Sequence, residues 1–142
     1  MDYFNVLVVD DDEGFLETIV NRLKKRKIDT VGVKSEADAF RLIKEKQFDV
    51  VILDMKMPGG RDGIKTLREI KKLQPLTEVL LLTGHASVET SIEGMKLGAF
   101  DYLLKPVKLE DLLIKLAGAF QQKDSHDQKI RSAQIKKLLR YW

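Results

Sequence analysis

The stretch Val50-Val51-Ile52-Leu53-Asp54 decides the fold and ends in the carboxylate on which the functional argument depends. A run of four aliphatic residues is typical of a strand that is buried on both faces, as the strands of parallel sheets are. An aspartate directly after such a run is expected at the carboxyl end of the strand, where open α/β sheets bind ligands. The segment Met55-Lys56-Met57-Pro58 and two glycines follow.

Two further aliphatic strands end in charged residues. The run Val6-Leu7-Val8-Val9 precedes Asp10-Asp11-Asp12, and a later strand ends in Lys105-Pro106. In a sheet of this kind the first and third strands are neighbours where the winding direction reverses, so their terminal carboxylates converge. The sequence therefore predicts an acidic pocket beside a cation. Such a pocket can hold a divalent metal and can make a carboxylate a nucleophile toward phosphorus.

The rest of the chain alternates short aliphatic runs with helix-length amphipathic stretches. Five strand–helix units predict a doubly wound α/β sandwich. Ser35 is a plausible N-cap of the second helix, and Gly98 is well placed to end the fourth. The weakest strand, Thr30-Val31-Gly32-Val33, is expected at an edge of the sheet. The expected strands are 5–9, 29–33, 49–53, 78–82 and 101–104, and the expected helices are 13–26, 35–46, 63–72, 87–97 and 108–120.

The last part of the chain differs from the rest in charge and pattern. Residues 121–142 carry a net charge of +4, whereas the remaining 120 residues sum to −1. After a polar segment at 121–129, apolar residues return at Ile130, Ile135, Leu138, Leu139 and Trp142. We expect a main domain over 1–121 and a basic helical tail or linker over 122–142. The tail either continues the fifth helix or forms a separate short helix, and it suggests docking, self-association or a linker.

Composition excludes several classes of function. The 142 residues suggest one domain, and the absence of cysteine excludes disulfides and thiolate chemistry. No apolar run approaches the roughly 18 residues of a membrane span, and the N-terminus lacks the features of a signal peptide. We therefore expect a cytoplasmic protein with no membrane contact. Because the basic pI comes from the tail, it is poor evidence that the main domain binds nucleic acid.

The expected pocket suits phosphoryl transfer. Three carboxylates close together stay ionised only if a cation compensates their repulsion, and an all-oxygen ligand set favours Mg²⁺ or Mn²⁺. Lys105 can contact a phosphoryl oxygen, and Thr83 offers a hydroxyl after the fourth strand. Positioning and cations supply most of the catalysis in such a reaction. Asp54 would attack in line and become an aspartyl phosphate.

Five motifs in this order resemble the response-regulator receiver domain of two-component signalling. The resemblance covers about residues 4–120 and implies a flavodoxin-like fold with strand order 2-1-3-4-5, together with a C-terminal helical extension. The segments 82–87 and 96–102 look most like receivers attached to nitrogen-regulatory-type transcription activators. The motifs are Val8-Val9-Asp10-Asp11, Leu53-Asp54-Met55-Lys56-Met57-Pro58, Asp62-Gly63, Leu82-Thr83-Gly84 and Tyr102-Leu103-Leu104-Lys105-Pro106.

The resemblance implies a role for each matching acidic-pocket residue. Asp54 is expected to be the phosphoacceptor. Asp11 and Asp54 are expected to bind the metal directly, with Asp10 acting through water. Lys56 would contribute its backbone carbonyl to the same ion. No organic cofactor is expected.

The resemblance also implies a switch. Thr83 is expected to be the switch hydroxyl, and Tyr102 the switch aromatic whose rotamer follows it. Lys105 is expected to bind the phosphoryl group, with a cis bond to Pro106 aiming the ammonium into the pocket.

Some residues depart from the family pattern, and others are expected to have no role in the site. Gly59-Gly60-Arg61 makes the loop after Pro58 one residue longer than the commonest spacing, and Lys108 is a poor N-cap. Asp12 is expected to be a solvated residue at a helix start. His85 is expected in a surface loop beside the pocket, and His126 is expected to be inert.

The resemblance predicts a signalling domain rather than an enzyme with its own substrate. It would take a phosphoryl group from the phosphohistidine of a sensor histidine kinase and slowly hydrolyse the product. A homodimer could form through the fourth helix, fifth strand and fifth helix, or through the C-terminal helix. We expect no direct DNA binding.

Two alternatives and one question of context stay open. The chain could be an aspartate-nucleophile phosphatase, although Lys56 stands where that class needs a second acid. It could also be an interaction module with a vestigial pocket. As a receiver, it either stands alone or belongs to a longer regulator.

Overall fold

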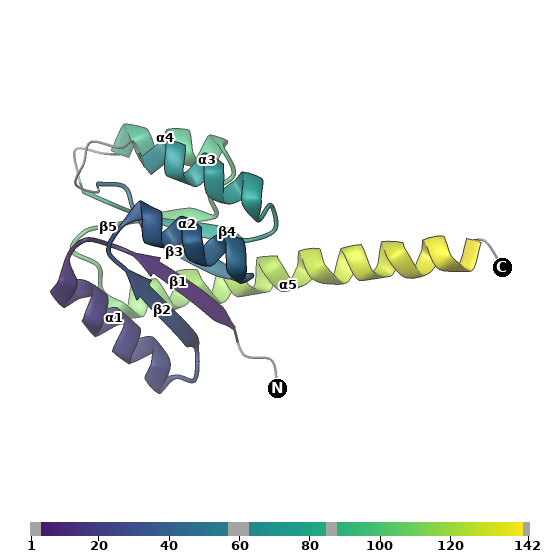
Figure 1. Ribbon diagram of the computed structural model, residues 1–142, viewed down its shortest axis with the longest axis horizontal. Coiled ribbons are helices and arrows are strands. Elements are labelled where there is room, and N and C mark those ends of the chain that lie inside the picture. Colours follow the sequence, from purple (N-terminus) through teal and green to yellow (C-terminus); the bar gives the residue numbers. More distant parts are fainter. Residues whose placement is uncertain (1–3, 57–62, 85–87, 141–142) are drawn as a thin grey trace.

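A single parallel sheet of five strands forms the centre of the protein (Figure 1). The computed structural model describes residues 4–56, 63–84 and 88–140. The strands lie in the order β2-β1-β3-β4-β5, which confirms the predicted flavodoxin-like topology. The weak strand β2 lies at one edge, as expected. The strands are β1 (Asn5–Val9), β2 (Asp29–Val33), β3 (Val50–Asp54), β4 (Glu78–Thr83) and β5 (Asp101–Leu104).

Helices cover both faces of the sheet. Alternate residues of each strand point to opposite faces, so the sheet forms two hydrophobic cores. Val6 and Val8 pack with α1 and α5, whereas Leu7 and Val9 pack with α2 and α3. The helices are α1 (Glu13–Lys25), α2 (Glu36–Glu45), α3 (Gly63–Leu73), α4 (Val88–Lys96) and α5 (Leu109–Arg140).

Local sequence explains where several helices begin and end. The side chain of Asp12 accepts a hydrogen bond from the backbone N–H of Phe15, and Ser35 does the same for Asp38. Each is therefore an N-cap that satisfies a free N–H of the first helical turn. Gly98, two residues after the end of α4, has a φ of +102°, a conformation that glycine adopts without steric cost. These three predictions are confirmed.

Strand register brings the carboxyl ends of the central strands to one edge. Val9 of β1 lies opposite Leu53 of β3, and Asp54 lies opposite Leu82 of β4. The N–H of Lys105 donates to the carbonyl of Thr83 at 2.8 Å, which joins the ends of β4 and β5. Residues that follow these strands must therefore share one site.

Helix α5 is much longer than the helix expected at 108–120. It runs without interruption for 32 residues, about 48 Å at 1.5 Å per residue. Leu112, Leu116 and Ala119 near its start pack against the sheet, and the far part of the helix projects away as a rod (Figure 1). The tail is therefore a continuation of the fifth helix. Within the described residues, no helix has both the length and the apolar character that a membrane span requires.

Candidate functional site

Three aspartates meet at the carboxyl edge of the sheet. One carboxylate oxygen from each of Asp10, Asp11 and Asp54 lies within 4.8 Å of the others. Asp10 and Asp54 are buried, at 0% and 3% exposure, whereas Asp11 is exposed. The predicted convergence of acids after β1 and β3 is thus present.

Backbone N–H groups fix the two buried carboxylates. The N–H of Asp12 donates to Oδ1 of Asp10 at 2.9 Å, and the N–H of Lys56 donates to Oδ1 of Asp54 at 3.1 Å. In each case the donor lies two residues after the acid, so the turn that follows the strand holds the acid in place. The other oxygen of each acid stays available to a cation.

Lys105 is that cation in the described structure. Its Nζ lies 2.9 Å from Oδ2 of Asp10 and 3.3 Å from Oδ2 of Asp54. The ammonium also lies 5.4 Å from the centre of the Phe15 ring, a cation–π contact. The Lys105–Pro106 peptide bond is cis, as predicted. Lys105 therefore joins the ends of β1 and β3 from the end of β5.

Burial and the neighbouring charges both shift the pKa values of Asp54 and Lys105. Burial raises the pKa of Asp54 to about 6, and the charge of Asp10 adds to this, although the Lys56 N–H and Lys105 oppose it. Burial lowers the pKa of Lys105, but its hydrogen bond to Asp10 and the charges of Asp54 and Asp10 outweigh burial and raise it overall. The lysine thus stays charged near neutral pH. An added cation would stabilise the ionised carboxylate of Asp54.

The donor set fits a hard divalent ion. Three carboxylates within 4.8 Å of one another supply only oxygen ligands, which Mg²⁺ prefers and which soft metals do not. Asp10, Asp11 and Asp54 are the residues that would hold the ion. The expected contribution of the Lys56 carbonyl stays a prediction.

Thr83 lies on β4, the strand next to Asp54, and Tyr102 lies on β5, one strand further along the sheet. Thr83 ends β4, is 1% exposed, and its hydroxyl donates to the carbonyl of Gly84 at 3.1 Å. Tyr102 on β5 is half-buried and packs against the core formed with α2 and α3. Both lie in the predicted neighbourhood, and their switch roles stay predictions.

Several predicted features lie outside the described residues. These are the segment Met57-Pro58, the longer loop Gly59-Gly60-Arg61 with Asp62, His85, and Trp142 of the tail.

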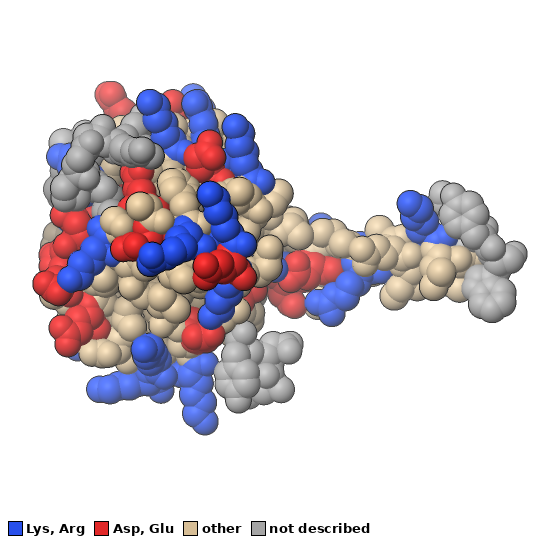
Figure 2. Space-filling view, in the orientation of Figure 1, with Lys and Arg blue, Asp and Glu red and all other residues tan. Residues whose placement is uncertain are grey.

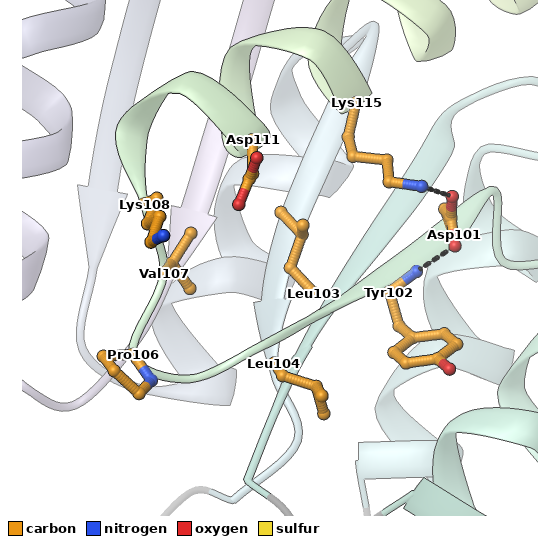
Figure 3. Close-up of a pocket in the computed structure, with 9 residues that line it drawn as sticks. All are labelled: Asp101, Tyr102, Leu103, Leu104, Pro106, Val107, Lys108, Asp111 and Lys115. Carbon is orange, nitrogen blue, oxygen red and sulfur yellow. Dashed lines mark hydrogen bonds and ion pairs between the residues drawn. The ribbon is translucent and has the colours of Figure 1, made fainter.

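Some features of the site were not predicted. Phe15 had the spacing of a core residue in α1, and its place beneath the Lys105 ammonium had no signal in the sequence. A hollow of about 350 Å³ lies between β5 and the start of α5, beside an ion pair of Asp101 and Lys115 (Figure 3). Figure 3 shows the Tyr102 ring pointing away from Lys115. This hollow is separate from the three aspartates.

His126 makes contacts that were not predicted. Its Nδ1 lies 3.8 Å from Oε1 of the buried Glu78, and its Nε2 lies 3.2 Å from the Gln122 amide. The polar sequence around it gave no sign of the contact with Glu78, since Glu78 is far away along the chain. The expectation that it is inert stays a prediction.

Comparison with known proteins identifies the family of this chain. A family model described as "Response regulator receiver domain" matches residues 6–117. The chain belongs to the response regulator receiver family. Transcriptional regulatory protein ZraR of Escherichia coli (strain K12) is 37% identical over 126 residues, which cover 89% of this receiver and 28% of ZraR.

Solved structures give the same result. A response regulator receiver domain protein from Clostridium thermocellum matches with a TM-score of 0.80 and 39% identity, covering 85% of this receiver and 97% of that chain. NtrX from Brucella abortus, in complex with ADP, matches with a TM-score of 0.83 and 26% identity, covering 89% of this receiver and 29% of NtrX. The predicted likeness to receivers of nitrogen-regulatory-type activators is confirmed.

The receiver spans little more than a quarter of the length of ZraR and NtrX. What those longer proteins do as a whole is therefore not established for this chain by the match.

Proposed function

We propose that this receiver accepts a phosphoryl group on Asp54, with Mg²⁺ bound, from the phosphohistidine of a sensor histidine kinase. The observation that carries the proposal is the placement of the Lys105 ammonium between Asp10 and Asp54, with Asp11 in the same cluster. A carboxylate that is fixed by one N–H and faces a cation has the arrangement that a nucleophile toward phosphorus needs.

Each residue of the site would have its own role in the phosphoryl transfer. Oδ2 of Asp54 would attack phosphorus in line, so that a P–O bond forms while the P–N bond of the donor breaks. Lys105 would move from its present pairing to an oxygen of the arriving phosphoryl group. Asp10 and Asp11 would hold the metal, whose charge offsets the negative charge that develops on the equatorial oxygens. Slow hydrolysis of the product would reset the receiver.

The modified site would then alter the neighbouring strands. A phosphoryl group adds roughly −1.5 to −2 charges, which attract the Thr83 hydroxyl. We propose that Thr83 turns from the Gly84 carbonyl toward the phosphoryl oxygen and that Tyr102 follows. The face that changes is formed by α4, β5 and α5, where Ile92 and Leu104 are exposed at 49% and 39%. Residues 1–121 carry this chemistry, and 122–142 form an extension.

Labelling with radioactive acetyl phosphate tests the proposal. The parent chain should form a hydroxylamine-sensitive acyl phosphate in the presence of Mg²⁺ and should not form it when EDTA is added before the phosphodonor. Asp54→Asn should abolish labelling, because an amide is no nucleophile toward phosphorus. Asp38→Asn, on the exposed surface of α2, is the matched control and should label like the parent.

Equal labelling of Asp54→Asn and the parent would refute the role of Asp54. Sustained release of phosphate from a phosphate ester would instead favour the phosphatase alternative.

A further inference from the structure

The ring of Phe15 lies beside the ammonium of Lys105 at the edge of the candidate site. The Lys105 Nζ lies over the ring, 5.4 Å from its centre, which is within the reach of about 6 Å that a cation–π contact has. The same Nζ lies 2.9 Å from Oδ2 of Asp10 and 3.3 Å from Oδ2 of Asp54. Two carboxylates and one aromatic ring therefore surround this cation.

The start of α1 places the ring. The Asp12 side chain accepts a hydrogen bond from the Phe15 N–H at 3.2 Å, and the Asp12 N–H donates to Oδ1 of Asp10 at 2.9 Å. The turn that fixes the buried acid therefore also fixes the residue that carries the ring. Phe15 is half-buried and packs against the core that α1 and α5 form with the sheet, which limits the orientations of its ring.

Lys105 needs a restraint that does not hold it back from a phosphoryl group. Its side chain is 31% exposed and carries its charge on a flexible four-carbon stem, so other rotamers can take the ammonium toward the solvent. Keeping such a stem in one conformation costs side-chain entropy. A contact that favours the inward conformation lowers this cost at the moment of reaction.

An aromatic ring restrains the ammonium differently from an acid. Acidic side chains already gather where α1 begins, with Asp11, Asp12 and Glu13 all exposed (Figure 2). A further carboxylate would add to the repulsion in the site and would compete with the phosphoryl group for the ammonium. The negative face of a ring attracts the cation without binding a particular N–H, so the N–H groups of Lys105 can still turn toward a phosphoryl oxygen.

We propose that Phe15 is a positioning residue for the phosphoryl transfer, and that the face of its ring keeps the Lys105 ammonium beside Asp54. The proposal rests on the function proposed above, because it concerns the same reaction. When a phosphoryl group arrives, the ammonium shifts from the carboxylates to a phosphoryl oxygen while it stays in contact with the ring. Phe15 acts through Lys105 and not on the reacting atoms.

Fluorine substitution on the ring provides the first test, because it weakens the negative face while the shape of the side chain changes little. Mono-, di- and trifluorophenylalanine in place of Phe15 should label progressively more slowly with acetyl phosphate at saturating Mg²⁺. The trifluoro variant should be slowed about two- to fivefold, the range of a cation–π contact at a partly exposed site. Equal rates across the fluorine series would overturn the proposal, since Phe15 would then only fill space.

Two further replacements of Phe15 sharpen this test. Cyclohexylalanine has a six-membered ring without a negative face and should be slowed as much as the trifluoro variant. Phe15→Tyr keeps the negative face and should label like the parent. The opposite order of these two rates would contradict a cation–π contact.

Phe48 offers a matched control. The Nζ of Lys46 lies over the Phe48 ring, 5.5 Å from its centre, so the same kind of contact exists at the amino end of the sheet. Trifluorophenylalanine in place of Phe48 should therefore label at the parent rate. Equal slowing by fluorine at both positions would show a general effect on the fold and would contradict the proposal.

Proton NMR of the chain without Mg²⁺ and phosphodonor provides a test that does not depend on phosphorylation. The ring should shift the resonances of the Lys105 ε-methylene protons upfield, because these protons adjoin the Nζ that lies over its face. Phe15→Leu should abolish this shift. A parent chain without the shift would overturn the proposed contact.

The two measurements separate this proposal from the function on which it rests. A parent chain that shows the ring shift but does not label refutes the proposed function, and the role of Phe15 falls with it. A parent chain that labels on Asp54, while the fluorine series leaves the rate unchanged, overturns only the role of Phe15.

Discussion

Clusters of buried and half-buried charged residues lie at both ends of the central strands. The two clusters differ in their ratio of cations to acids. At the carboxyl end, in the part of the chain that the structure describes, one ammonium, Lys105, faces the carboxylates of Asp10, Asp11 and Asp54. Negative charge is in excess there. A divalent cation would neutralise the excess, and so the cluster is suited to bind such an ion and to accept a phosphoryl group.

The amino end of the same strands holds a more nearly balanced cluster. Lys123 of α5 lies 3.7 Å from Asp49, just before β3, and 2.7 Å from Asp127. Glu78, the first residue of β4, is close to Lys71, Lys123 and the ring of His126. Two lysines therefore face three acids here, and the excess of negative charge is smaller than at the carboxyl end.

The comparison shows that burial of charge does not by itself identify a reactive site. Both clusters use aspartates, lysines and the ends of β3 and β4. What differs is the unmatched negative charge, together with the exposure of Asp11 to solvent. We therefore assign chemistry to the carboxyl end and anchoring of α5 to the amino end.

Lys105→Met should have the largest effect. Loss of the ammonium should slow phosphorylation about a hundredfold, because a cation at the reacting oxygens is missing. In EDTA the variant should also lose about 2 kcal/mol of unfolding free energy, since two buried acids lose their partner, and Mg²⁺ should restore part of it. Labelling rates and urea unfolding measure the two effects.

Lys115→Met is the matched control, because Lys115 pairs with Asp101 beside the separate hollow. Equal slowing of phosphorylation in both variants would mean that Lys105 acts only through general charge.

Lys123→Met should have an effect of intermediate size, on stability and not on phosphorylation. Its side chain is 14% exposed between Asp49 and Asp127, so removal should cost about 1–2 kcal/mol of stability. The rate of phosphorylation should not change, since the amino end takes no part in the chemistry. Lys129→Met, on the exposed part of α5, should alter neither quantity. A slower phosphorylation of Lys123→Met would contradict the division between the two ends.

Glu78→Gln should have the smallest effect, visible as a pH dependence. Burial raises the pKa of Glu78 above its ordinary 4.5, although Lys71, His126 and Lys123 oppose the shift. The folded protein then keeps this proton where the unfolded chain releases it, so stability falls as pH rises through the window that begins near 4.5.

Gln cannot ionise. The stability of the variant relative to the parent should therefore increase as the pH is raised from 4 to 7. The expected gain is below about 1 kcal/mol and is measured by urea unfolding at both pH values. A relative loss on going to pH 7 would show that the ion pairs of Glu78 outweigh its burial.

The sequence was sufficient for the fold and for the acidic site, for physical reasons. Aliphatic runs such as Val50–Leu53 have one stable place, the middle of a covered parallel sheet, and the acid after each run must lie at the carboxyl edge. The predicted strands and the first four helices accordingly agree with the structure to within one or two residues.

What could not be predicted depends on contacts between distant segments. The ring of Phe15 beneath Lys105, the hollow beside β5, and the contact of His126 with Glu78 each join elements whose separation the local pattern does not encode. The length of α5 was left open because the polar segment 121–129 interrupts its apolar stripe. In the structure that segment is helical because Lys123 and His126 find partners at the amino end of the sheet.

Mass spectrometry of the phosphorylated chain tests the central claim most directly. After treatment with acetyl phosphate and Mg²⁺, borohydride reduction converts an aspartyl phosphate into homoserine, which tandem fragmentation locates. We predict homoserine at position 54, only when Mg²⁺ is present. Homoserine at another aspartate, or at position 54 to the same extent in EDTA, would contradict the account.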